Sequence, residues 1–156
     1  MYCPLYIQHD LADSYGETYA KNACALCAMA CASSIACNDS SITPVRAIND
    51  GVATKSSPAV KNWSHYCTIS STKSAGNEAS GLRTIHQEIN DGSPVIIQLS
   101  PSHYVVGYHA LINSNTSAGN VTASDIYVMD PWAGYRTLEE VYVKLKKSWN
   151  GYKTVR

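Results

Sequence analysis

The stretch PVIIQLSPSHYVVGYHALINS (94–114), followed after a polar loop by SDIYVMD (124–130), decides the fold class of this chain. Its runs are rich in β-branched and aromatic residues, and turn residues separate them. Such runs predict successive antiparallel strands. From Tyr135 to the end we expect one further strand and then a short helix around residues 139–149.

The segment CALCAMACASSIA (24–36) lies outside this strand-rich region and has a different character. Its alanines, methionine and other small residues predict a tightly packed, buried helix, and Asn22 just before it is a suitable N-cap. Two further helices are predicted. One begins after Thr43-Pro44, because threonine is a good N-cap and proline suits the first helical position. The other covers 80–90, where apolar residues recur at helical spacing.

The remaining segments read as less regular structure. Residues 1–23 are expected to be turn-rich and polar with a short extended piece, LYIQ (5–8), and residues 52–80 to be mostly loop. A helical first half followed by a strand-rich second half predicts an α+β fold. The length of 156 residues suits one compact domain over 1–156 with a real core.

Charge and hydropathy exclude several classes of partner. Twelve basic residues balance twelve acidic ones, and KLKK (144–147) is the only basic cluster. We therefore expect neither nucleic acid nor an anionic membrane surface as a partner. No apolar stretch is long enough to span a bilayer, and MYCPLYIQHD (1–10) lacks the pattern of a signal peptide.

The chain has six cysteines, at positions 3, 24, 27, 31, 37 and 67. Cys24, Cys27 and Cys31 follow a spacing that places all three along one face of a helix, where bonds among them are disfavoured. The CxxC pair has no second ligand pair for zinc, so no metal is expected. We expect one reactive cysteine and several small buried ones, with a Cys3–Cys67 bridge left open. Mostly reduced thiols fit the cytoplasm, or synthesis inside a bacterial or phage-infected cell.

Cys24 is the candidate nucleophile because it would be the first residue of the predicted helix. Unpaired N–H groups and a partial positive charge at a helix N-terminus favour a thiolate, which is the nucleophilic form of cysteine. Cys27 and Cys31 lie further along the helix and lack this advantage. On these grounds alone, a packed structural role for Cys24 is an equal alternative.

A cysteine nucleophile needs a base, and two histidines compete for that role. His103 begins the strand SHYVV, so a rigid element would hold it at an exposed end. His109 lies six residues later, on the same strand face if no bulge intervenes, and about 20 Å away. Asp130 ends the strand IYVMD and suits the orienting role in a Cys-His-Asp triad. Gln8 is a candidate amide donor to the oxyanion, together with the backbone N–H of Cys24.

These residues, in this order, resemble a known family. YIQHD, YG, NACALCAM, PVIIQLSPSHYVVGY and IYVMDPWAG, spread from residue 6 to 134, resemble the bacteriocin-processing type of papain-like cysteine peptidase, the double-glycine leader peptidases and their stand-alone bacterial and phage relatives. The resemblance implies a papain-like fold, with the nucleophile at a helix N-terminus packed on a C-terminal antiparallel sheet. It also implies that Gln8 serves the oxyanion, Cys24 is the nucleophile, His103 the base and Asp130 the orienting residue.

The sequence departs from the family pattern at three places. Ala23 stands where the family usually has glycine, and Cys27 where threonine or serine is common. Gly107 follows His103 by four residues, a shortening of the family motif that keeps His109 in contention. The processing peptidases are fused to a membrane exporter and this chain is not, so leader cleavage is not implied for it.

The function predicted from these features is hydrolysis of a peptide or isopeptide bond by a cysteine peptidase that needs no cofactor. A peptide, a protein and the stem peptides of a bacterial cell wall are candidate substrates. Two alternatives stay open: an acyltransferase with an amine or thiol acceptor, and an inactive binding module. The walls of a substrate cleft are expected in the region 52–80, with Trp63, His65 and Tyr66, and in the loop 113–124, with simple surface connection as the alternative for both.

Overall fold

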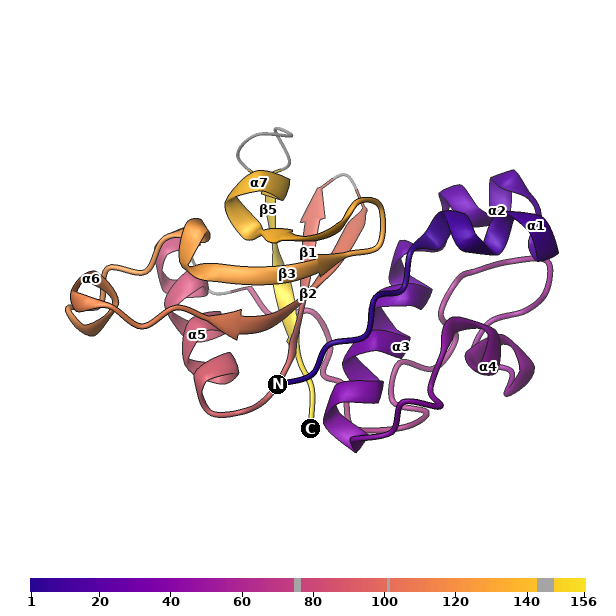
Figure 1. Ribbon diagram of the computed structural model, residues 1–156, viewed down its shortest axis with the longest axis horizontal. Helices are drawn as coiled ribbons and strands as arrows, with labels where there is room; N and C mark the ends of the chain where they lie inside the picture. Colours follow the sequence, from indigo (N-terminus) through magenta and orange to yellow (C-terminus); the bar gives the residue numbers. More distant parts are fainter. Residues whose placement is uncertain (75–76, 101, 143–147) are drawn as a thin grey trace.

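A computed structural model describes residues 1–74, 77–100, 102–142 and 148–156 of the chain (Figure 1). Its first half contains a 3-10 turn and four helices: η1 (Gln8–Leu11), α1 (Ala12–Tyr15), α2 (Glu17–Lys21), α3 (Cys24–Cys37) and α4 (Pro44–Asn49). Its second half contains the strands and the remaining short elements: α5 (Glu78–Asn90), β1 (Val95–Ser100), β2 (His103–Ala110), α6 (Ser114–Ser117), η2 (Ala123–Asp125), β3 (Ile126–Asp130), β4 (Gly134–Thr137), α7 (Leu138–Tyr142) and β5 (Ser148–Thr154).

The strands form one five-stranded antiparallel sheet in the order β4-β3-β2-β1-β5. The predicted α+β class and the antiparallel pairing of the runs at 94–130 are confirmed. The C-terminal prediction is wrong in part. A helix was expected over 139–149; α7 covers Leu138–Tyr142, but Ser148 and Trp149 belong to β5. Residues 143–147 lie outside the described ranges. Pairing with β1 places β5 at the edge of the sheet and makes its aromatic and β-branched residues a strand.

The first 23 residues contain more helix than their composition predicts. The elements η1, α1 and α2 are each four or five residues long, too short to be stable alone, so tertiary packing must hold them. Asn22 does not cap α3, as was expected. Its side-chain amide instead donates to the carbonyl of Thr18 at 2.8 Å and closes the end of α2, while the N-cap of α3 is Ala23 without a side-chain bond.

The other helix predictions are confirmed. Thr43 caps α4 through a side-chain bond from the Arg46 N–H, and Pro44 occupies the first helical position. The helix predicted over 80–90 begins slightly earlier, at Glu78, because the side chain of Asn77 accepts from the N–H of Ser80. These local signals act within three residues, so the sequence alone is sufficient to reveal them.

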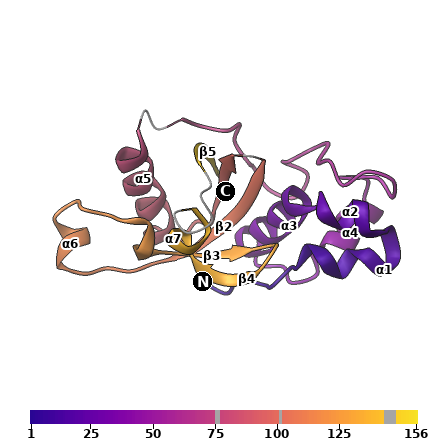
Figure 2. The same cartoon turned by 90° about the horizontal axis from the view of Figure 1, so that it is seen from above.

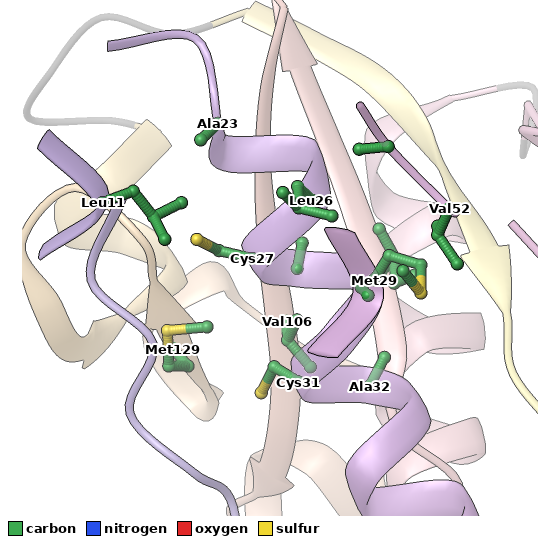
Figure 3. Packing of buried hydrophobic residues seen from close by; sticks show 14 of the residues in the cluster. Leu11, Ala23, Leu26, Cys27, Met29, Cys31, Ala32, Val52, Val106 and Met129 are labelled. Carbon is green, nitrogen blue, oxygen red and sulfur yellow. The ribbon is translucent and has the colours of Figure 1, made fainter. Parts of the chain in front are cut away.

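The sheet is packed on both faces, with α3 on one side and α5 on the other (Figures 1 and 2). Strand β1 shows the division, since Ile96 belongs to the cluster around α3 whereas Val95 and Ile97 belong to the cluster around α5. Figure 3 shows the α3 side, where Cys31 of the helix lies close to Val106 of β2. This packing sets α3 against the middle of the sheet and brings its N-terminus to the end where β2 begins. None of the helices in the described ranges is long and apolar enough to cross a membrane.

Candidate active site

Cys24 is the first residue of α3, as the sequence predicts. Its Sγ lies 3.5 Å from the carbonyl oxygen of Ser102, and its side chain interacts electrostatically with that of His103. The residue is 9% exposed, so most of its surface is covered by neighbouring residues. Because the first N–H groups of a helix have no intrahelical acceptor, the start of α3 offers donors and a partial positive charge beside this sulfur.

His103 stands between the thiol and a carboxylate. Its Nε2 lies 2.8 Å from Oδ1 of Asp130, and since a carboxylate only accepts, the imidazole donates. Burial opposes the charged imidazolium, but the hydrogen bonds to Asp130 and Cys24, together with the charges of both, raise the pKa of His103 to about 9. At neutral pH the imidazole is therefore protonated and carries a proton that it can donate beside the sulfur.

Asp130 is the last residue of β3 and is fully buried. Its Oδ1 also accepts from the backbone N–H of Trp132 at 2.9 Å. Its Oδ2 has no hydrogen-bond partner among the described residues, but Nη1 of Arg136 lies 3.8 Å away. The positive charges of Arg136 and His103 both favour a buried anion at this position. The carboxylate is thus held in one orientation toward the imidazole.

Gln8 lies in the same region, but its amide does not point at an open site. The side chain is almost fully buried, and Nε2 donates to the carbonyls of Ala20 and Lys21 at 2.9 and 3.0 Å. The backbone N–H of Gln8 donates to the carbonyl of Pro131 at 2.8 Å. Gln8 therefore ties together the segments that lead to the nucleophile and away from Asp130. Both amide protons have acceptors, so a role at the oxyanion stays a prediction.

His109 is separated from this group by the length of β2. It is exposed, and its ring lies 5.5 Å from that of Tyr127. The register of β2 against β3 shifts between Gly107 and His109, so the simple alternation assumed from the sequence does not hold there. The structure thus brings His103, and not His109, to Cys24 and Asp130.

The two segments expected to form cleft walls lie in different parts of the molecule. Trp63 packs against Tyr104 with ring centroids 5.4 Å apart, and Tyr104 directly follows His103. The pKa of Tyr104 is raised, mainly by burial and also by the charge of Cys24, which places its phenol near the site. The 113–124 segment lies elsewhere, since both views place α6 at the opposite end of the molecule from α1 and α2 (Figures 1 and 2).

Three contributors to the site were not anticipated. Ser102 adopts a φ of +21°, which non-glycine residues rarely occupy, and this turn directs its carbonyl at Cys24. The N–H of Trp132 and the guanidinium of Arg136 hold Asp130. A turn after an Asp-Pro pair is a local signal for the N–H of Trp132, but Arg136 reaches Asp130 only through the pairing of β4 with β3.

No other feature of the described residues competes with this arrangement. They contain no group of three or more His, Cys, Asp or Glu side chains that could hold a metal ion. A cavity of about 620 Å³ lies between α5, η2 and α7, and its lining includes Glu78, Leu82 and Tyr142 but none of the candidate site residues. Cys24 is therefore the candidate reactive group.

Comparisons with known proteins assign no family to the chain. No protein-family model matches it, and neither a curated protein nor a solved structure does. The functional argument consequently rests on the geometry of the Cys24, His103 and Asp130 side chains.

Proposed function

We propose that this protein is a cysteine peptidase of papain-like fold that hydrolyses peptide or isopeptide bonds. The observation that carries the proposal is the contact of Cys24, at the start of α3, with His103, which is itself hydrogen-bonded to the buried Asp130. The order of these groups along the chain, and a nucleophile helix packed on an antiparallel sheet, are those of the papain-like peptidases that the sequence resembles.

The reaction begins with the Cys24 thiolate. Its sulfur attacks the carbonyl carbon of the substrate, a C–S bond forms, and the carbonyl oxygen becomes an oxyanion. The backbone N–H of Cys24 is a donor to this oxyanion because it has no acceptor within the helix. Gln8 supplies a second donor if its amide leaves the carbonyl of Ala20 or Lys21.

His103 carries the proton in both half-reactions. As an imidazolium it protonates the amine while the C–N bond breaks, which leaves a thioester on Cys24. The neutral imidazole then takes a proton from water, and the hydroxide attacks the thioester. The C–S bond breaks and the acid leaves, which restores the Cys24 thiolate and the His103 imidazolium. Asp130 keeps the ring in position and stabilises its charge throughout.

The first test of the proposal is the reactivity of Cys24 toward iodoacetamide at neutral pH. Cys37 is the matched comparison, because its thiol is exposed whereas Cys24 is mostly buried. Access alone therefore favours Cys37, and faster labelling of Cys24 reports activation of its thiol. If Cys24 reacts no faster than Cys37, the chain is not a thiol enzyme and the binding-module alternative replaces the proposal.

The second test identifies the bond that is cleaved. The protein and its Cys24→Ala variant are incubated with a peptide library and with purified cell-wall fragments, and new amino termini are measured. We expect products only with the unsubstituted protein. Adding an amine acceptor distinguishes the outcome, since transfer of the acyl group in preference to water would show an acyltransferase instead.

A further inference from the structure

Four of the five cysteines outside the candidate site lie in two pairs. The first pair joins the N-terminal segment to the middle of α3, where Sγ of Cys3 lies 3.5 Å from Sγ of Cys31. Both residues are buried, and both thiols also approach the carbonyl oxygen of Pro4. All six cysteines are free thiols in the structure, so this contact is one between two unbonded sulfurs.

The second pair joins Cys37, the last residue of α3, to Cys67. Cys67 lies two residues before Ile69, which forms an isolated β-bridge with Val155. Sγ of Cys37 lies 3.5 Å from the carbonyl oxygen of Tyr66, the residue directly before Cys67, and the side chains of Cys37 and Cys67 interact electrostatically. Cys67 also contacts Oγ of Ser33 at 3.6 Å. Cys37 is exposed and Cys67 half-buried, so a reagent in solution can reach this pair directly.

These contacts replace the Cys3–Cys67 bridge that the sequence left open. Cys3 meets Cys31 and Cys67 meets Cys37, so neither is available to the other without rearrangement. The last cysteine, Cys27, is fully buried in α3, and burial raises the pKa of its thiol. It lies three residues after Cys24 on one helix, a spacing that disfavours a disulfide.

We propose that the two pairs are disulfide sites, Cys3–Cys31 and Cys37–Cys67, which close when the protein meets a small-molecule disulfide oxidant and leave Cys24 as the reactive thiol. Because Cys37 is the exposed member, its thiolate attacks the oxidant and releases one small thiol, which forms a mixed disulfide. The Cys67 thiolate then attacks the Cys37 sulfur and expels the second small thiol. The protein loses two electrons and two protons for each bond, and the oxidant is reduced to two thiols.

Each bond would fasten a segment of the candidate site to α3. The Cys37–Cys67 bond holds the segment that carries Trp63, whose ring packs on Tyr104 beside His103. The Cys3–Cys31 bond holds the N-terminal segment that leads to Gln8. Each closes a loop of about 30 residues, and we expect each to raise the melting temperature by about 5–10 °C.

The decisive experiment maps the bonds without reference to peptidase activity. The Cys24→Ala chain is treated with oxidised glutathione, both folded and during refolding. Free thiols are then blocked with iodoacetamide, and the protein is digested without reduction. We expect crosslinked peptides that join 3 to 31 and 37 to 67, with Cys27 alkylated after unfolding. A Cys3–Cys67 peptide, a scrambled mixture, or no crosslink in either treatment overturns the proposal.

Single variants separate the two bonds. In Cys67→Ser, Cys37 should remain a mixed disulfide with glutathione, because the thiol that resolves it is missing, while the 3–31 crosslink persists and the gain in melting temperature falls by about half. Cys27→Ala is the matched control, since it removes a cysteine from the same helix and should leave both crosslinks unchanged. Loss of the 3–31 crosslink in Cys67→Ser would contradict independent pairs. Failure of the peptidase proposal alters none of these readouts, because they report thiols and not turnover.

Discussion

The two ends of strand β2 carry the same residue type in opposite circumstances. His103 begins the strand, its side chain is 13% exposed, and it meets Asp130 and Cys24. His109 lies near the other end, is exposed, and contacts the ring of Tyr127. The pairing is antiparallel, so the start of β2 lies beside the end of β3, where Asp130 stands. Position along a strand is therefore insufficient to assign a base, and the neighbouring elements decide which histidine can act.

The largest difference is expected between the variants that remove the histidine at one end of β2 and at the other. His103→Ala should lower kcat/KM by about 10⁴-fold, because the thiolate loses its imidazolium and the leaving amine its proton donor. His109→Ala should leave it within about twofold, since an exposed ring against Tyr127 contributes little. Turnover of the peptide found by library screening measures both. Activity retained in His103→Ala and lost in His109→Ala would reverse the assignment.

The next effect concerns the two aspartates at opposite ends of β3. Asp130→Asn should lower kcat by about 10³-fold, because the amide can neither fix the ring in the same way nor stabilise its charge. Asp125→Asn is the matched control, since Asp125 is also mostly buried but accepts hydrogen bonds from Thr122, away from the site. Circular dichroism checks that both variants fold. Equal losses in the two variants would show a structural role only.

A smaller effect is expected at Gln8. Gln8→Ala should lower kcat by about 10²-fold if the amide reaches the oxyanion, and should also lower the free energy of unfolding by about 2 kcal/mol. The second loss arises because the carbonyls of Ala20 and Lys21 lose their donor in a buried place. Denaturant melts and steady-state kinetics measure the two separately. A folded variant with unchanged kcat restricts Gln8 to holding the chain around the site.

The last effect is a dependence of stability on pH that only the histidine at the start of β2 should cause. The pKa of His103 is raised to about 9, above its unfolded value near 6.5. The contacts of protonated His103 therefore stabilise the folded protein fully below about pH 6.5. This contribution to the free energy of unfolding, at most about 3 kcal/mol, is lost as the pH rises through 9. Denaturant melts from pH 6 to 10 measure it. His109→Ala should keep this dependence and His103→Ala should lose it; the same slope in both would exclude His103 as its source.

Local sequence patterns predicted the helices and strands correctly wherever the cause of the structure lay within a few residues. Thr43 and Pro44 began α4, and the β-branched runs became β1, β2 and β3. Signals failed where a distant partner decided the outcome. The short helices before Cys24 depend on tertiary packing, and β5 depends on the free edge of β1. The position of His86 in α5 also depends on a distant partner, since the residue is buried and its Nε2 lies 2.6 Å from the carbonyl oxygen of Leu111.

The sequence by itself determined the helix that begins at Cys24, the strands that begin at His103 and end at Asp130, and the α+β class, because periodicity and residue preference act locally. Only the tertiary structure decided that His103 is the histidine beside Cys24, that Arg136 and Trp132 hold Asp130, and that the amide of Gln8 already has acceptors. It also decided which cysteines meet. These contacts join residues far apart in the chain, and packing of α3 on the sheet, which no local pattern encodes, brings them together.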